Sequence, residues 1–461
     1  MAVVVGLGLP AAVCAQGAPP KSLPAPSGNP LAIDFSKDPV LGFAHDTMAP
    51  ELFEQTVSRA VSIHAGVREA EAAARAVAAE KDEARSGLFP TVDLGLQHDR
   101  SLSRQFGSDD NAVVERVRPY RRTDATATLT QNLFDWGATS DRIRAAGARE
   151  RMANQDVRST ADDIALRAIS AWYDVAAYRA LVAMGGALDI SQRDLIESVR
   201  MRIKQGLSAE GDLARVLTYT SNAQARLAGF RRSLSNAEAR YAEVIGLAPP
   251  EEVRRPAFTA ALPRSVDEAR IAAANTPQVR SAELAATAAR ADWAAVSASN
   301  KPNVAGVIDA GRYGLIENDN DYDIRARVIL RHRLIGGGGS ARNAQAEGRY
   351  EQARAAAERV TQEAEREAAI TFLDLQASHE EVAALEAAYK ANRQARDVLA
   401  ERFRSTQGSL TDVLNSEDSY FQIAAQYIQS VTRLDALKLV LLQRGGNLLS
   451  TLGVALPDTS Q

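Results

Sequence analysis

The chain has 461 residues, with 54 basic and 58 acidic side chains and a formal net charge of -4. Hydrophobic residues make up 46% of the sequence but aromatic residues only 5%, so alanine carries much of the apolar content, which favours long, closely packed helices over a large globular core. The near-neutral charge balance excludes nucleic acid as the main partner, because such a partner needs a basic surface.

The N-terminus is typical of a secretory signal. An apolar stretch ends at Val13-Cys14-Ala15, so residues 1–15 are predicted to be a signal peptide. The usual basic residues before this stretch are missing, which leaves the true translation start open. Cys14 is the only cysteine and is an alternative site of lipid attachment, although the residues before it fit a lipobox poorly. Cleavage after Ala15 leaves no cysteine, which excludes disulfides and thiolate metal sites.

The next segment, residues 16–49, is rich in proline, glycine and serine and is predicted to be an extended or disordered N-terminal arm. No run of eighteen apolar residues follows the N-terminus. No helix is therefore expected to span a membrane.

The rest of the chain carries the same pattern twice. Identical residues recur in pairs that lie 200 positions apart: Gly137 and Gly337, Ser140 and Ser340, Arg142 and Arg342, Arg149 and Arg349, Asp174 and Asp374, Arg202 and Arg402, Asp212 and Asp412. We therefore predict an internal two-fold repeat with copies at residues 50–246 and 265–445. A proline-rich connection at residues 247–264 joins the copies, and a C-terminal tail at residues 446–461 follows them.

Each copy is predicted to begin with a helix of about 35 residues that ends at a proline, because proline stands where a helix stops and extended chain begins. Two strands follow in each copy, at residues 91–98 and 123–133 and at residues 303–312 and 322–333. Their apolar and polar residues alternate. Such segments suit either a half-buried soluble sheet or an outer-membrane barrel, and alternation alone does not decide between the two.

A glycine-rich stretch, LIGGGGSARN at residues 334–343, follows the last strand. A glycine-rich turn between strand and helix binds phosphate in nucleotide-binding folds. The first copy has Asp135 and the bulky Trp136 at the matching turn, and neither copy has the lysine of a Walker-type loop. We therefore interpret Gly137 and Gly337 as strand-to-helix hinges, where glycine permits the turn.

A long helix is predicted after each hinge, at residues 138–204 and 340–404, since these segments are rich in helix formers and lack proline. At 1.5 Å per residue, each would be on the order of 100 Å long. A short turn then leads into a returning helix at residues 211–245 or 410–443. Two such helices joined by a tight turn form an antiparallel coiled-coil hairpin.

Two duplicated motifs resemble those of the TolC family of bacterial outer-membrane export channels. The family's strand-to-helix loop commonly reads Leu-Phe-Asp-Gly-Gly, which residues 133–137 match except at Trp136. Its second motif is arginine, an aromatic residue, two positions, glycine, five positions, then Asp-Val-Leu. Arg402-Phe403 and Asp412-Val413-Leu414 keep this spacing, with Thr406 in the glycine position. The resemblance covers nearly the whole mature chain.

The resemblance implies a mixed α and β membrane protein that forms a homotrimer. Four strands per chain would close a trimeric twelve-stranded β-barrel in the cell outer membrane, in contact with its lipid, and the helices would continue it as a periplasmic α-helical barrel. Barrel closure would also remove the two exposed edges of an isolated four-stranded sheet.

The implied function is that of a passive exit duct in a tripartite export system. An inner-membrane pump of ABC or RND type would drive export through a periplasmic adaptor protein, for type I protein secretion or small-molecule efflux. No cofactor is expected, and no arrangement of catalytic residues or metal ligands points to an enzyme. The rival interpretation is a periplasmic coiled-coil scaffold without a pore.

The resemblance also implies that positions 412 and 415 ring the narrow periplasmic entrance, where acids help to close it and favour cations. Here these positions are Asp412 and Asn415. Alternatively, Asp412 belongs to a capping box that begins at Ser409 and satisfies free N–H groups at a helix start. Arg402 and Arg404, one turn earlier, are the candidate partners for the charge of Asp412.

Three arginines, Arg325, Arg327 and Arg331, alternate with apolar residues in the last strand. They would face the barrel lumen, because each charge facing lipid near the midplane costs roughly 2–4 kcal/mol. A solvated face of a soluble sheet would explain them equally well.

Overall fold

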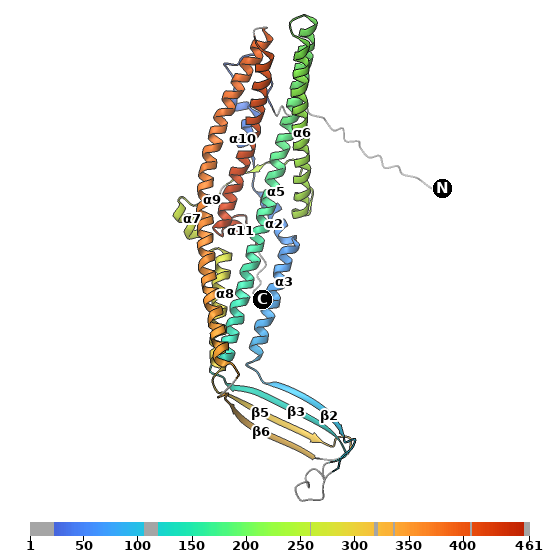
Figure 1. Cartoon of the computed structure of the whole chain (residues 1–461), viewed down its shortest axis with the longest axis vertical. Helices are drawn as coiled ribbons and strands as arrows, with labels where there is room; N and C mark the ends of the chain where they lie inside the picture. Colours follow the sequence, from blue (N-terminus) through green and yellow to red (C-terminus); the bar gives the residue numbers. More distant parts are fainter. Residues whose placement is uncertain are drawn as a thin grey trace, which may run out of the picture.

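The computed structural model describes residues 23–105, 119–258, 260–317, 321–334, 337–405 and 408–455. The molecule is elongated and mostly helical, with long helices along one axis and a four-stranded sheet at one end (Figure 1). The signal peptide expected at residues 1–15, with Cys14, lies outside the described residues.

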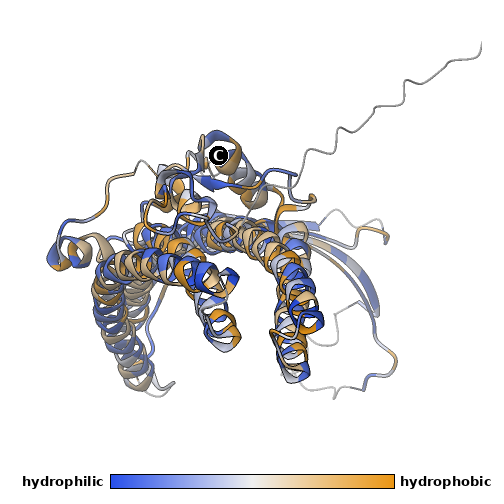
Figure 2. Cartoon of the chain, turned by 90° about the horizontal axis from the view of Figure 1, so that it is seen from above, coloured by the Kyte–Doolittle hydropathy of each residue, from blue (hydrophilic) through white to orange (hydrophobic). Residues whose placement is uncertain are grey.

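Two helices span the helical part from the sheet to its far end, α5 (Ala138–Lys204) and α9 (Gly339–Arg404). Each turns back into a shorter antiparallel helix, α6 (Glu210–Ile245) or α10 (Leu410–Arg444). Seen along the long axis, the helices form a curved layer rather than a closed bundle (Figure 2). Among the residues described, none of the helices combines the length and apolar character needed to cross a lipid bilayer.

The prediction of a single helix of about 35 residues before each strand pair is wrong. Two helices stand in each place: α2 (Glu51–Ile63) and α3 (Ala65–Ser86), then α7 (Val266–Ala273) and α8 (Pro277–Ser299). The first break is at His64, whose ring Nδ1 accepts a hydrogen bond from the N–H of Gly66 at 3.0 Å and caps α3. The second comes before Pro277, which has no N–H to continue α7 and starts α8 instead.

The N-terminal arm is also not extended throughout, contrary to the expectation for residues 16–49. Its described part contains three short elements: η1 (Phe35–Lys37), α1 (Pro39–His45) and β1 (Thr47–Met48). The Asp38 carboxylate accepts hydrogen bonds from the N–H groups of Val40 at 2.8 Å and Leu41 at 3.2 Å, which caps α1. Val40 and Leu41 are both buried, so two apolar side chains anchor a segment whose overall composition is polar.

The connection and the tail carry structure as well. β4 (Arg255–Pro256) lies in the connection and pairs in parallel with β1 of the arm. In the tail, α11 (Leu448–Thr451) buries Leu448 against the helices. The last described residue is Ala455.

The four strands form one antiparallel sheet in the order β2-β3-β5-β6. Their bounds are Thr91–Arg100, Arg121–Phe134, Asn303–Tyr313 and Asp321–Arg331. The two strand pairs meet where β3 lies beside β5, with Thr128 opposite Asp309. The outer edges of β2 and β6 are not paired with any described strand of the chain.

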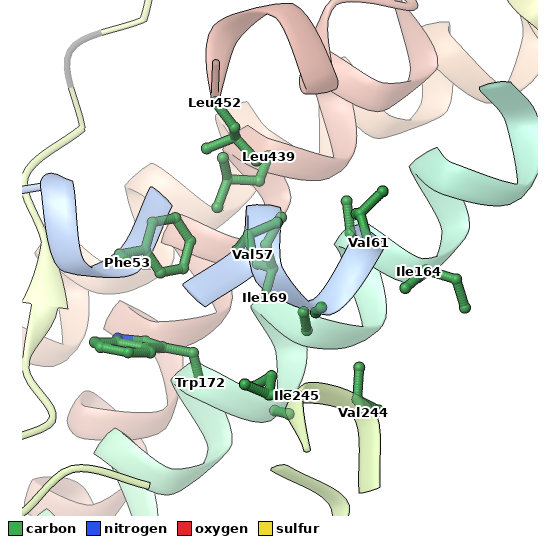
Figure 3. Packing of buried hydrophobic residues seen from close by; sticks show 14 of the residues in the cluster. Phe53, Val57, Val61, Ile164, Ile169, Trp172, Val244, Ile245, Leu439 and Leu452 are labelled. Carbon is green, nitrogen blue, oxygen red and sulfur yellow. The ribbon is translucent and has the colours of Figure 1, made fainter. Parts of the chain in front are cut away.

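The largest hydrophobic core lies where α2 crosses α5, around the middle of the long helices (Figure 1). Trp172 of α5 is fully buried, with the ring of Phe53 edge-on to it at 5.6 Å. Its Nε1 donates a hydrogen bond to the carbonyl oxygen of Arg254 at 2.8 Å. Leu439 and Leu452, from the far end of the chain, join this cluster (Figure 3).

Each strand-to-helix hinge has a left-handed glycine, with φ of 88° at Gly137 and 79° at Gly337. At the first hinge, Asp135 fills the turn. Its carboxylate accepts hydrogen bonds from the N–H of Gly137 at 3.1 Å and from the N–H and hydroxyl of Thr139 at 2.8 and 2.6 Å. A side-chain anion therefore occupies the place where a phosphate would bind.

We expect Gly137→Ala to lower the free energy of unfolding by about 1–2 kcal/mol, because alanine is strained at this positive φ. Gly147→Ala is the matched control. Gly147 lies inside α5 with open space around its Cα, so alanine should raise the stability by up to ~1 kcal/mol through its helix propensity. Urea unfolding of both variants measures the difference, and equal effects would contradict the hinge role.

Candidate functional site

The two hairpin tips lie together at the end of the molecule farthest from the sheet (Figure 1). Arg402 and Arg404 end α9, and Asp412 and Asn415 stand on the first two turns of α10. The structure therefore brings the four residues predicted for the periplasmic entrance to one tip.

Asp412 does not have the partners proposed for it from the sequence. The capping box is wrong, because the Ser409 side chain makes no cap hydrogen bond at the start of α10. Arg404 pairs with Glu401 at 3.3 Å instead. Within the described part of the chain, no ion pair or hydrogen bond joins the Asp412 carboxylate to another side chain. Asp412 is exposed at the tip.

Asn415 takes part in a set of contacts between the two hairpins that the sequence analysis missed. Tyr219 of α6 donates a hydrogen bond from its hydroxyl to Asn415 Oδ1 at 2.6 Å. Three further contacts join the hairpins: Arg215 Nη1 with Thr411 Oγ1 at 2.5 Å, Arg202 Nη1 with the Phe403 carbonyl at 3.0 Å, and the ion pair of Arg226 with Asp418. We call these four contacts the inter-hairpin links.

A sequence signal for most of these links existed. The α6 members stand at positions 215, 219 and 226, and the α10 members at 411, 415 and 418. Spacings of three, four and seven put each set on one face of its helix. Two facing polar stripes at helical spacing were therefore visible, but nothing local showed that they face each other.

Between the hairpins, α5, α9 and α10 border a groove of about 1020 Å³ with mostly apolar walls. Glu417 of α10 stands in its wall and is almost completely buried. Its carboxyl group accepts hydrogen bonds from the Ser191 hydroxyl at 2.9 Å and from Gln192 Nε2 at 3.1 Å, both on α5. Burial raises the pKa of Glu417 above its usual value, and the hydrogen bond from Ser191 and the nearby Arg396 guanidinium only partly offset this.

The three strand arginines lie on the face of the sheet opposite the large apolar side chains. Arg327 of β6 pairs with Asp309 of β5 at 2.5 Å, and Arg325 pairs with Asp323 of its own strand. The other face carries exposed apolar residues, including Val328 at 73% and Leu94 at 82% exposure. One face is therefore apolar and the other is charged and hydrogen-bonded.

The described ranges contain no group of three or more His, Cys, Asp or Glu side chains placed to hold a metal ion. The arrangement offers exposed surfaces and a groove where a partner or small molecule could bind.

Residues 56–247 match the model of the family described as outer membrane efflux protein. The chain is also 25% identical over 319 residues to the outer membrane efflux protein BepC of Brucella suis biovar 1 (strain 1330), covering 68% of this chain and 69% of that protein. Both matches show that the chain resembles this family. These matches confirm the resemblance to TolC-type export channels that the two duplicated motifs indicated.

Solved structures of outer-membrane channels share the fold. The VceC outer membrane protein of Vibrio cholerae superimposes with a TM-score of 0.76 at 18% identity, over 85% of this chain and 95% of that chain. The MtrE channel of Neisseria gonorrhoeae in its open state gives a TM-score of 0.72 at 18% identity, over 88% and 91%.

These matches support an outer-membrane protein with a helical extension into the periplasm, acting as an exit duct for efflux or secretion. Its relatives are channel proteins and not enzymes.

Glu417→Gln should stabilise the protein more at pH 8 than at pH 4. Because the folded-state pKa of Glu417 is raised, the folded state binds more protons than the unfolded state above pH ~4.5, so wild-type stability falls as pH rises through the raised pKa. Each unit of that shift costs about 1.4 kcal/mol at high pH, and glutamine removes the cost.

Thermal unfolding at both pH values measures this effect. The control is Glu347→Gln, since Glu347 is exposed on α9 and its replacement should leave the pH dependence as in wild type. A Glu417→Gln variant that is no more stable than wild type at pH 8 would contradict the burial penalty.

Proposed function

We propose that three copies of the chain form one passive exit duct, with a twelve-stranded barrel in the outer membrane and a helical tunnel through the periplasm. The sheet is the observation that supports this most. The edges of β2 and β6 lack a described partner strand, and one face of the sheet is apolar and exposed. Unpaired edges and large apolar surfaces are unfavourable in water. Pairing β6 of one copy with β2 of the next, with the apolar face toward lipid, relieves both.

The helices support the same assembly. The curved layer seen in Figure 2 has the shape of one sector of a tube wall. α5 has 67 residues, so it extends for about 100 Å. Three such sectors around one axis would form a tunnel that continues the channel of the barrel. Each long helix follows its strand directly through a glycine hinge, so the wall would be continuous.

A duct of this kind supplies a path and no energy. We therefore propose that an inner-membrane pump of ABC or RND type drives export through a periplasmic adaptor protein. Small-molecule efflux is the favoured role over type I protein secretion, since BepC is described as an efflux protein.

The entrance of the duct would lie at the hairpin tips. Three-fold symmetry would bring three copies of Asp412 toward one axis, where a narrow mouth concentrates negative potential and attracts cations. Asn415, Arg402 and Arg404 would surround this ring. The inter-hairpin links would hold α10 against the first hairpin and keep the mouth closed until an adaptor displaces it.

Val328→Arg should reduce the yield of trimer much more than Arg327→Ala. The first change places a charge on the lipid-facing side, at a cost of roughly 2–4 kcal/mol per copy near the midplane. The second removes a charge from the opposite face, where Arg327 pairs with Asp309. Light scattering of the detergent-extracted protein measures the assembly. Equal yields, or a wild-type protein that purifies as a soluble monomer without detergent, would favour a periplasmic scaffold.

Asp412→Asn should lower the preference for cations in planar bilayers, because it removes three negative charges from the proposed mouth. The control is Ser409→Ala at the same helix start. Ser409 makes no side-chain cap bond, so its replacement should change neither selectivity nor stability. If Asp412→Asn keeps the reversal potential of wild type, the selective ring lies elsewhere.

A further inference from the structure

A buried ion pair joins the N-terminal arm to the second hairpin. Arg393 of α9 pairs with Asp38 at the start of α1, and their side chains are only 10% and 0% exposed. The hydroxyl of Tyr389 donates a hydrogen bond to Asp38 at 2.8 Å and lies 2.8 Å from the hydroxyl of Tyr420. The Asp38 carboxylate therefore holds α1 and α9 together at one point.

In the first hairpin, the matching arginine has a counter-charge on its own helix. Arg193 of α5 stands 200 positions before Arg393 and pairs at 2.5 Å with Asp189, four residues earlier on the same helix. In α9, the position four residues before Arg393 is Tyr389, which has no charge to offer. Arg193 is also 68% exposed, so water can solvate it, whereas Arg393 depends on a protein counter-charge.

The arm contacts α9 again one turn farther toward the tip. Arg396 Nη2 donates a hydrogen bond to the carbonyl oxygen of Pro24 at 3.0 Å, and the N–H of Ser27 donates to Asp397 at 3.2 Å. Arg396 and Asp397 are both buried, and Arg396 Nε lies 2.7 Å from Asp397 Oδ1. α9 continues from these contacts without interruption to Arg404 at the tip.

We propose that Asp38 is a positioning residue for the entrance: by neutralising Arg393 it holds α9 in the hairpin layer and so keeps the second hairpin tip closed. This inference rests on the proposed function as a gated duct. Without the carboxylate, the buried guanidinium gains by moving into water, and the helix end that carries Arg402 and Arg404 moves with it. The second hairpin would then leave its closed position, while the first keeps its own counter-charge.

Single-channel recording in planar bilayers tests this with Asp38→Asn, Arg393→Met and the double variant. Asp38→Asn should raise the occupancy of the open state on the order of tenfold, within the range of coupling between distant sites. Arg393→Met should raise it much less, because no guanidinium is left to move into water. The double variant should return close to wild type, because removing both charges leaves none unpaired. Asp34→Asn is the control. Asp34 lies in the same arm, but it is exposed and bonds only within the arm.

If Asp38→Asn conducts like Asp34→Asn, the inference is overturned. A double variant that is as open as Asp38→Asn would overturn it as well. A wild-type protein that forms no channel would contradict the proposed function instead. If Asp38→Asn does not assemble, Tyr389→Phe replaces it, since this removes only the hydroxyl that holds Asp38. It should raise the open-state occupancy by a smaller factor, and wild-type behaviour would overturn the inference.

Discussion

The backbone N–H and C=O groups along the outer edges of β2 and β6 have no partner strand in the described part of the chain. A sheet with two free edges and one bare apolar face is not a stable end state in water or in lipid. In the proposed trimer, joining these edges between copies would fix the symmetry of the whole assembly. The curvature of the helical layer and the direction of each long helix must then agree with the sheet, because α5 and α9 leave it through short hinges.

The small side chains that dominate the sequence make the helical layer possible. Ala161, Ala165 and Ala168 of α5 are fully buried. Helix axes lie 8–10 Å apart according to the side chains at the contact, so alanine allows the closest approach. The wall stays thin, and large side chains such as Trp172 and Phe53 are concentrated where the shorter helices cross α5.

Features that depend on local chemistry could be predicted from the sequence. The bounds of α5 could be predicted from a proline-free run of helix-forming residues. The strands could be located from their alternating apolar and polar residues, because a one-residue shift in register would exchange the two faces of the sheet. Features that depend on distant partners could not. No local pattern shows that Asp38 meets Arg393 or that Tyr219 meets Asn415. The break at His64 was missed because helix propensity gives little weight to a histidine cap.

The core around Trp172 combines Phe53 from near the start of the chain with Leu452 from near its end. Contacts between such distant segments slow folding, because loop-closure entropy is lost before the contacts form. A chain still emerging into its compartment therefore lacks one wall of its main core until the last residues arrive. Exposed apolar surface on such an intermediate favours aggregation, whereas a chain of stacked local repeats can bury the surface of each unit against its neighbour.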